Sequence, residues 1–172
     1  MIEEQVILVD EQDNELGVME KLEAHRIPTL HRAISVFIVN SKGEWLLQQR
    51  ALDKYHSNGL WTNTCCSHPR PGESNLEAAR RRLLEEMGME AELSELFHFV
   101  YREVLDNDLT EYELDHVFVG ISDQVPHINA DEVHNYKYVT YEDLQEDIKK
   151  NPWSYTVWFL KIVNRVNEYL NK

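Results

Sequence analysis

Residues 61–89 read WTNTCCSHPRPGESNLEAARRRLLEEMGM, and this stretch decides the expected fold. Its second half predicts a helix that begins after Ser74 or Asn75, either of which can cap it, and that runs to about Met87. Gly88 follows, and glycine is the usual residue in the left-handed turn that ends a helix. Apolar residues recur at helical spacing along this segment, so one face of the helix is expected to pack against a core.

The polar residues of the same segment follow a diphosphate-handling pattern with one change. They resemble the Nudix box, G-x5-E-x7-R-E-U-x-E-E-x-G-U, through seven residues in register, namely Glu73, Arg81, Leu83, Glu85, Glu86, Gly88 and Met89. The residue after Arg81 should be a glutamate, and here it is Arg82. A Nudix hydrolase uses its row of carboxylates to gather magnesium ions, whereas an arginine binds phosphate. The altered box is therefore expected to hold a diphosphate without cleaving it.

Composition indicates an ordinary globular protein with an acidic balance. The 172 residues are 42% hydrophobic and 28% charged, and suit one domain with a substantial core, taken as residues 1–172. The net charge of −14 argues against nucleic acid or an anionic membrane as a general partner. An anionic substrate therefore needs a local concentration of basic residues, and the sequence offers Arg50 and Lys54 and then the run Arg80, Arg81 and Arg82.

Cysteine usage and the first residues indicate a cytoplasmic protein. The only two cysteines, Cys65 and Cys66, are adjacent and cannot staple a fold, which favours a reduced compartment. The N-terminal MIEEQVILVDEQD lacks the basic and apolar regions of a signal peptide. No apolar run approaches the roughly 20 residues that span a bilayer.

The remaining chain predicts strands with a few interspersed helices, which indicates an α/β or α+β sandwich. The turn at residues 40–43 favours a β-hairpin between two apolar strands, and residues 53–59 are expected to form a loop. The expected strands are 6–9, 33–39, 45–49, 96–104, 113–121 and 136–139, and the expected helices outside the box are 20–25, 141–150 and 153–170.

Several histidines and glutamates outside the box have the chemistry of metal ligands. Glu111 and Glu113 sit at i and i+2 of an expected strand, so both point to one face. His25, His31 and His68 supply imidazoles. Each residue taken alone is more often an ordinary surface or core side chain. If they meet, three imidazoles and two carboxylates suit Mn²⁺ or Zn²⁺ better than Mg²⁺, while Glu86 beside a diphosphate suits Mg²⁺.

Three further residues have both a catalytic and a structural interpretation. Cys66 lies near the expected helix start and the arginine cluster, a setting that lowers the pKa of a thiol. Trp153 can stabilise a cation or simply pack in the core together with Trp158. Tyr101 is either a core residue of a strand or a hydrogen-bonding partner in a cavity.

Taken together, the motifs resemble the type 1 isopentenyl diphosphate isomerases of the Nudix superfamily. The match runs from about residue 4 to residue 158 and includes EKLEAHR, QQRALDK, WTNTCCSHP, RPGES, RRRLLEEMG, EYELD and NPW. The resemblance implies a Nudix-like α/β/α sandwich with a mixed sheet. It also implies the reversible 1,3-allylic isomerisation of isopentenyl diphosphate to dimethylallyl diphosphate, without nucleic acid or membrane partners and as a monomer or homodimer.

The resemblance also implies a role for each matching residue. Glu113, aided by Tyr101, is expected to donate a proton, and Cys66, as a thiolate, to accept one, with Trp153 facing the hydrocarbon. The diphosphate contacts are expected at Lys21, Arg50, Lys54 and Arg82. One Mn²⁺ or Zn²⁺ is expected on His25, His31, His68, Glu111 and Glu113, and a Mg²⁺ that bridges to the diphosphate on Glu86.

Two other functions stay open at this point. A Nudix hydrolase of a nucleoside diphosphate derivative needs the carboxylate that Arg82 replaces, and it leaves Cys66 and the Glu111 and Glu113 pair without a task. A non-catalytic metal-binding module would use the same ligands for structure alone, and its function would not depend on Cys66 or Glu113.

Overall fold

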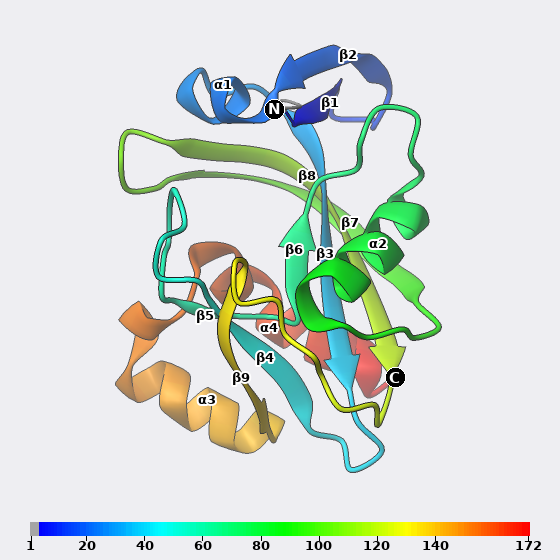
Figure 1. Cartoon of the computed structure of the whole chain (residues 1–172), viewed down its shortest axis with the longest axis vertical. Helices are drawn as coiled ribbons and strands as arrows, with labels where there is room; N and C mark the ends of the chain where they lie inside the picture. The colour runs from blue at the N-terminus through cyan, green and yellow to red at the C-terminus, as the bar shows by residue number, and fades with distance from the viewer. Residues whose placement is uncertain (1–3) are drawn as a thin grey trace.

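The computed structural model describes residues 4–172 and contains one mixed sheet with helices on both faces (Figure 1). The strands are β1 (Gln5–Val9), β2 (Glu15–Glu20), β3 (His31–Val39), β4 (Trp45–Arg50), β5 (Trp61–Thr62), β6 (Cys65–Ser67), β7 (Ser94–Val104), β8 (Thr110–Ile121) and β9 (Val133–Val139). The helices are α1 (Lys21–Arg26), α2 (Asn75–Met87), α3 (Tyr141–Lys150), the 3₁₀ turn η1 (Pro152–Ser154) and α4 (Val157–Leu170).

Strand β3 organises the sheet because it pairs with four other strands. It runs parallel to β8 over its whole length and antiparallel to β1, β4 and β6. Its pairing with β8 sets His31 opposite Glu113, and its pairing with β6 sets Ser35 opposite Cys66. Strand β7 continues the sheet beyond β8, and β9 continues it beyond β4. Residues from distant parts of the chain therefore meet around β3.

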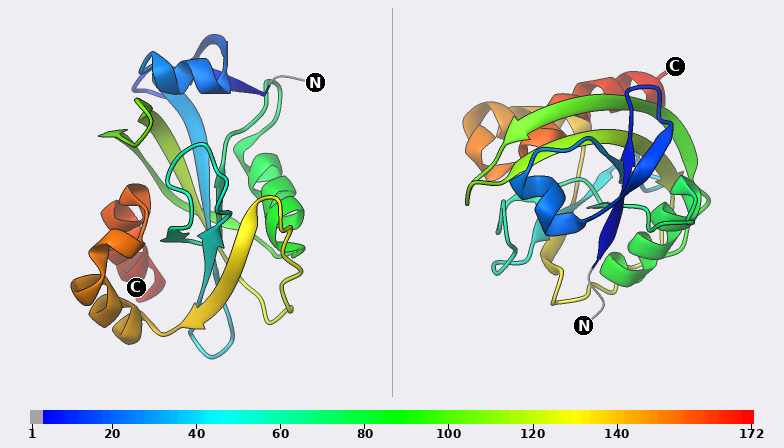
Figure 2. Two further views of the ribbon diagram at one scale, coloured as in Figure 1. Left: turned by 60° about the vertical axis from the view of Figure 1, so that its left-hand side comes forward. Right: turned by 90° about the horizontal axis from the view of Figure 1, so that it is seen from above.

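The two faces of the sheet are buried against different helices, as the two views in Figure 2 show. Ile34, Val36 and Ile38 of β3 pack with the apolar face of α2. The alternate residue Phe37 packs on the other side with Phe159 of α4. A strand covered on both faces is apolar at nearly every position, and β3 has this composition. The expected α/β/α sandwich with a mixed sheet is confirmed.

Helix α2 begins and ends where the sequence predicts. The Ser74 hydroxyl accepts from the backbone N–H of Glu77, and the Glu77 side chain accepts from the Ser74 N–H, which completes a capping box. At the other end Gly88 has a left-handed backbone with φ of 62°. The bounds of α2 therefore follow from local hydrogen bonding, independent of the rest of the fold.

Two local expectations were wrong at their boundaries. The last helix starts at Val157 because the Thr156 hydroxyl caps it, and residues 152–154 form a separate 3₁₀ turn. Cys66 was expected close to the start of the box helix, but it lies in β6, on the edge of β3. The first turn of α2 is therefore not adjacent to the thiol in the chain.

One face of β3 and β8 changes from apolar to polar along its length. Near the α4 end this face carries Phe37 and Val117, which are buried against the helix. Toward the other end the same alternation brings His31, Glu111 and Glu113 to that face, all of them buried. The fold thus leaves a polar recess beside the end of α4. Among residues 4–172, no helix is long and apolar enough to cross a membrane.

Replacement of Gly88 by alanine is expected to destabilise the protein more than replacement of Gly43. Both glycines have positive φ, and a left-handed alanine costs about 1–2 kcal/mol. A Cβ at Gly43 meets nothing within 4 Å among the described residues, whereas one at Gly88 lies 2.5 Å from the His127 carbonyl oxygen. Overpacking then adds about 1–3 kcal/mol to the cost at Gly88. Urea denaturation of the two variants measures the difference, and equal losses would contradict this packing.

Candidate active site

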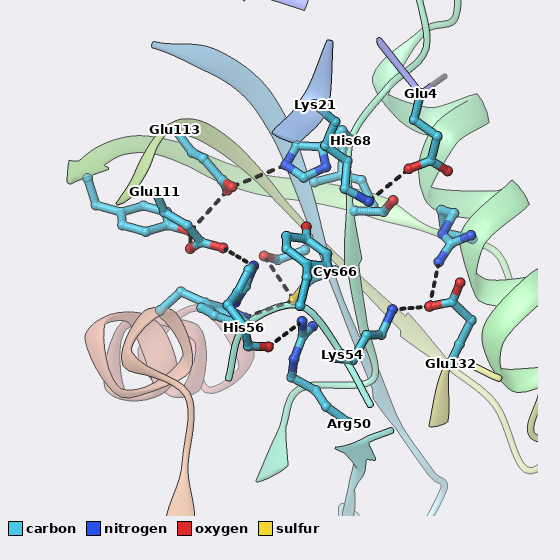
Figure 3. Close-up of a pocket in the computed structure, with 17 residues that line it drawn as sticks. Glu4, Lys21, Arg50, Lys54, His56, Cys66, His68, Glu111, Glu113 and Glu132 are labelled. Carbon is cyan, nitrogen blue, oxygen red and sulfur yellow. Dashed lines mark hydrogen bonds and ion pairs between the residues drawn. The ribbon is translucent and has the colours of Figure 1, made fainter. Parts of the chain in front are cut away.

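The recess at the polar end of β3 and β8 is a cavity lined almost entirely by charged and polar side chains (Figure 3). It collects residues from α1, from the loop after β4, from β6 and from α2, as well as from β7, β8 and α4. Nine residues expected at the site line it, namely Lys21, Arg50, Lys54, Cys66, His68, Arg82, Tyr101, Glu111 and Glu113.

Three imidazoles converge on one carboxylate at the inner wall of this cavity. Glu113 Oε1 lies 3.1 Å from His68 Nε2, 3.5 Å from His31 Nε2 and 3.9 Å from His25 Nε2. His25 and His31 are fully buried, with no exposed surface. Four of the five expected ligands of the transition-metal site therefore lie together. Their nitrogen and oxygen atoms are all within 4.8 Å of one another.

The hydrogen bonds behind the rings prepare this cluster for a cation. His25 Nδ1 lies 2.7 Å from the Lys21 carbonyl oxygen, and His31 Nδ1 lies 2.8 Å from the Thr29 carbonyl oxygen. A carbonyl only accepts, so each Nδ1 carries the proton and each Nε2 lone pair faces Glu113. Among the described residues neither Nε2 has a hydrogen-bond partner. Lone pairs that face a carboxylate repel it, and a divalent metal ion between them satisfies all of these groups.

Glu111 lies beside this cluster but with different neighbours. Its Oε1 is 3.5 Å from His56 Nε2, and it groups with His56 and His25, away from His31 and His68. The Tyr101 hydroxyl lies 2.6 Å from Glu111 Oε2 and 3.0 Å from Glu113 Oε2, so it can donate to either carboxylate. The two glutamates are thus joined through one phenol.

The surroundings of the two glutamates separate their pKa values. Burial and the charge of Glu113 raise the pKa of Glu111 well above its ordinary value. Burial alone would also raise the pKa of Glu113, but the neighbouring imidazoles of His31 and His68 outweigh it and hold that pKa well below the ordinary value. Burial lowers the pKa of His68 to about 4, so this ring is neutral at pH 7. Glu111 is therefore the weaker acid of the two glutamates.

Cys66 was expected to have a lowered pKa, and the structure corrects this. Burial and the nearby Asp115 carboxyl raise the pKa of the Cys66 thiol, so the sulfur carries its proton at pH 7. The thiol lies 3.0 Å from the accepting Asn63 Oδ1, and it accepts from Trp158 Nε1–H at 3.1 Å. The correction follows from the position of Cys66 within the sheet rather than at a helix end.

The aromatic residue at the cavity is Trp158, and the expectation for Trp153 was wrong. Trp153 lies in η1 with 71% of its surface exposed and does not line the cavity. Trp158, on the first turn of α4, is 3% exposed and lines the cavity next to Cys66. The Arg50 guanidinium lies 5.3 Å from the Trp158 ring centre. Helix α4 begins at Val157, four residues later than expected. The tryptophan that points into the cavity is therefore Trp158 and not Trp153.

The cations at the cavity mouth are each matched by an acidic residue. Lys21 Nζ lies 2.8 Å from Glu4 Oε2, and Lys54 forms an ion pair with Glu132 (Figure 3). Arg82 Nη2 lies 3.6 Å from the same Glu132 oxygen. These carboxylates relieve the repulsion among clustered positive charges. An incoming anion therefore meets ordered cations that are already partly neutralised.

Arg82 and Glu86 occupy the position where the Nudix box would supply two acids. Arg82 Nη2 lies 3.2 Å from Glu86 Oε1, one turn along α2. Glu86 is 4% exposed, and its Oε2 is buried without a hydrogen-bond partner among residues 4–172. Burial raises the pKa of Glu86, although Arg82 and Lys54 oppose that shift. The free oxygen suits a cation ligand, consistent with the Mg²⁺ expected there.

The ion pair between Glu73 and Arg81 of the box supports the site from behind. Arg81 donates from Nε at 2.7 Å and from Nη2 at 2.9 Å to the two Glu73 oxygens. Its Nη2 also lies 3.3 Å from the His68 carbonyl oxygen. A bidentate arginine–carboxylate pair is geometrically specific. It therefore fixes the backbone that carries the His68 ring.

Glu4, His56, Glu132 and Trp158 are among the cavity residues that sequence reasoning missed. Trp158 stands in the NPWSYTVW motif and needed only the right helix start. Glu4, His56 and Glu132 carry no local pattern, and they reach the cavity through ion pairs and strand packing between distant segments.

Comparison with known proteins agrees with this geometry. The family model of the NUDIX domain matches residues 29–159. "Isopentenyl-diphosphate Delta-isomerase" of Pectobacterium atrosepticum is 52% identical over 96% of this chain and 92% of its own length. "Isopentenyl-diphosphate Delta-isomerase 1" of Aromatoleum aromaticum is 54% identical over 96% of this chain and 93% of its own length. The chain belongs to the Nudix family and, within it, to the isopentenyl-diphosphate Delta-isomerases.

Solved structures support the fold of this family member. A crystal structure of a Deinococcus radiodurans protein superposes with a TM-score of 0.71 at 22% identity, covering 86% of this chain and 90% of that one. The MutT protein of Methanosarcina mazei superposes with a TM-score of 0.69 at 19% identity, covering 83% and 96%. At these identities the likeness concerns the fold alone.

The Glu73 to Gln change is expected to destabilise the protein at pH 7 by about 1 kcal/mol through loss of the charged pair. Burial raises the pKa of Glu73, but the hydrogen bond with Arg81 outweighs it and leaves the pKa lowered. The stabilisation is therefore present above the ordinary pKa of 4.5 and is lost as the pH falls through the lower folded value.

Urea denaturation at several pH values tests this dependence. Glu92→Gln serves as the control. The Glu92 side chain is fully exposed, and its pair with Arg80 is weak because the two groups are 3.9 Å apart. A deficit of the Glu73 variant that stayed constant from pH 7 to below pH 4.5 would contradict the assignment.

Proposed function

We propose that this protein interconverts isopentenyl diphosphate and dimethylallyl diphosphate by proton transfer in the cavity described above. The observation that carries the proposal is the joining, in one recess, of the cations Lys54 and Arg82 with Cys66 and the Glu113 cluster. Two relatives of this chain that are named isopentenyl-diphosphate Delta-isomerase support the same substrate. Both proteins are matched along nearly their whole length.

The diphosphate binds at the mouth of the cavity through Lys21, Arg50, Lys54 and Arg82. Their ordering by Glu4 and Glu132 supports this role, since cations already held in place lose little freedom when an anion arrives. The clustering of these four cations also gives an anionic substrate local partners on a chain with a net charge of −14. The hydrocarbon end of the substrate then extends inward past Cys66 and Trp158.

Two divalent ions have suitable ligands in this cavity. His25, His31, His68 and Glu113, with Glu111 beside them, would hold Mn²⁺ or Zn²⁺, and Glu86 would hold a Mg²⁺ shared with the diphosphate. When bound, such ions supply positive charge that offsets the phosphate charge and makes a neighbouring carboxyl a stronger acid. The remaining chemistry lies with the side chains of the chain itself.

Glu113 and Cys66 form the acid and base pair of the proposed reaction. Glu113, helped by the Tyr101 hydroxyl, adds a proton to the terminal methylene, and Cys66 removes one from the carbon nearer the diphosphate. Before this step the proton on the Cys66 sulfur must pass to the Glu113 carboxylate, so that the acid carries a proton and the base is a thiolate. Donation from Trp158 Nε1–H stabilises that thiolate. In the reverse direction the two groups exchange tasks.

Trp158 is suited to stabilise the positive charge that develops between the two proton transfers. Its indole lies against Cys66, so its ring is next to the carbon that loses a proton. Attraction between a cation and a desolvated indole face is worth about 2 kcal/mol or more. The surrounding buried wall limits the access of water, which would otherwise quench a carbocation.

Conversion of isopentenyl diphosphate to its allylic isomer is expected when Mg²⁺ and either Mn²⁺ or Zn²⁺ are supplied. Cys66→Ala and Glu113→Gln should each lower kcat by at least about 10²-fold, because each removes a group that transfers a proton. Exchange of deuterium from solvent into the product, followed by NMR, measures turnover. An inactive wild-type protein under both metal conditions would overturn the proposal.

An assay for released phosphate and nucleotide tests the hydrolase alternative, which Arg82 disfavours. Nucleoside diphosphate derivatives should release neither phosphate nor nucleotide under Mg²⁺, because the box lacks one of its carboxylates. Release of these products at a rate above that of isomerisation would make the protein a hydrolase.

Exchange of Trp158 for leucine should lower kcat by roughly 30-fold, which corresponds to the loss of about 2 kcal/mol of cation stabilisation. The matched change Trp153→Leu alters an exposed side chain in η1 and should leave kcat within about twofold. Steady-state kinetics on both variants compares them. A larger loss at Trp153 than at Trp158 would reverse the assignment made from the structure.

A further inference from the structure

His56 is a buried polar residue of the cavity that the proposed reaction does not yet use. It lies in the loop between β4 and β5, with 2% of its surface exposed, and it lines the recess beside Glu111 (Figure 3). A histidine this deeply buried is normally paired on both ring nitrogens. The partners of its two ring nitrogens therefore indicate the role of His56.

The two ring nitrogens of His56 join a loop hydroxyl to a carboxylate. Nδ1 lies 3.1 Å from Ser57 Oγ, and Nε2 lies 3.5 Å from Glu111 Oε1. When the Ser57 hydroxyl donates to Nδ1, Nε2 carries the ring proton and directs it at Glu111. The other oxygen of Glu111 accepts from Tyr101 at 2.6 Å. Glu111 is thus contacted from two sides, by a phenol that donates to it at 2.6 Å and by an imidazole at 3.5 Å.

The faces of the His56 ring are also in contact with active-site groups. The ring stacks near His25, with centres 5.8 Å apart, and meets Trp158 edge to face at 5.8 Å. One side chain therefore touches a histidine of the metal cluster, the neighbouring glutamate and the aromatic wall. The ring also packs edge to face against Tyr55, with centres 4.5 Å apart, and among the described residues it forms no hydrogen bond with the four cations proposed to bind the diphosphate.

The backbone of residue 56 has a separate task that a side-chain substitution preserves. Arg50 Nη2 donates to the His56 carbonyl oxygen at 3.1 Å, which orients the guanidinium. Since that bond uses main-chain oxygen, replacement of the imidazole leaves it in place. The function of the ring can therefore be tested apart from the position of Arg50.

We propose that His56 is a positioning residue of the isomerase site, one that orients Glu111 toward the metal cluster through Nε2 and supports Trp158 at the cavity wall. This inference rests on the function proposed above and adds a residue to it. Groups that hydrogen-bond a ligand from behind fix its direction, and their loss typically lowers metal affinity or activity by about 10–100-fold. His56 contacts Glu111 from behind in this way.

Three variants of the full-length protein separate the hydrogen bond from bulk. His56→Leu keeps much of the volume and removes the donor, whereas His56→Gln keeps an N–H donor at about the reach of Nε2. His134→Leu makes the same chemical change at an exposed histidine of β9 and is the control. Thermal unfolding of each variant first establishes that it is folded.

The first readout is metal affinity, which does not require turnover. Competition with a chelator should show His56→Leu binding Mn²⁺ or Zn²⁺ about 10–100-fold more weakly than wild type, with His56→Gln and His134→Leu within about threefold. The second is a kinetic split. His56→Leu should lower kcat by a similar factor, while KM for isopentenyl diphosphate stays within about threefold. The reason is that, within the described part of the chain, the His56 ring forms no hydrogen bond with the cations proposed to bind the diphosphate.

The outcomes distinguish this inference from the proposed function. Wild-type metal affinity in His56→Leu would overturn it, and so would equal losses in His56→Gln and His56→Leu, which would make the ring a packing element only. A changed visible spectrum of Co²⁺-loaded His56→Gln would make His56 a direct ligand and also overturn the positioning role. An inactive wild-type protein whose metal affinity still depended on the donor at position 56 would reject the isomerase function and retain the role of His56.

Discussion

The parallel pairing of β3 with β8 is the constraint on which the site depends. It sets His31 opposite Glu113, and the period of two along β8 carries Glu111 to the same face. His25 from α1 and His68 from the end of β6 then close around the Glu113 oxygen at 3.1–3.9 Å. A shift of the register by one residue would turn every one of these strand side chains to the opposite face. The cluster of imidazoles around Glu113 therefore depends on the register of the sheet.

Charge in this molecule is organised locally, against its overall balance. A chain with a net charge of −14 builds a cavity whose mouth presents Lys21, Lys54 and Arg82. Glu4 and Glu132 form ion pairs with these cations. Deeper in the cavity burial dominates, raising the pKa of Cys66 and of Glu111 and lowering that of His68. The outer part is suited to gripping an anion, and the inner part to moving protons in the absence of bulk water.

The parts of the fold that local chemistry determines could be predicted from the sequence. The capping box at Ser74 and the left-handed Gly88 fix the ends of α2, and both are visible in a few consecutive residues. The β3–β4 hairpin follows in the same way from its turn. The ligand types were also visible, and the structure does bring His25, His31, His68 and Glu113 together.

What the sequence could not supply depends on tertiary contacts. Trp153 and Trp158 are equivalent in pattern, and only the Thr156 cap decides that α4 starts late enough to turn Trp158 inward. The pKa of Cys66 follows from its burial in the sheet beside Asp115, which no local motif shows. His56 and Glu132 come to the cavity from loops whose paths are set by packing, and their partners are far away in the sequence.

Three imidazoles and Glu113 should together bind one divalent ion. X-ray absorption spectroscopy of the protein loaded with one equivalent of Zn²⁺ tests this, since imidazole rings give a characteristic multiple-scattering pattern. We expect three imidazole nitrogens at about 2.0–2.1 Å, with oxygen completing the shell and no sulfur at about 2.3 Å. A sulfur ligand, or fewer than three imidazoles, would contradict it.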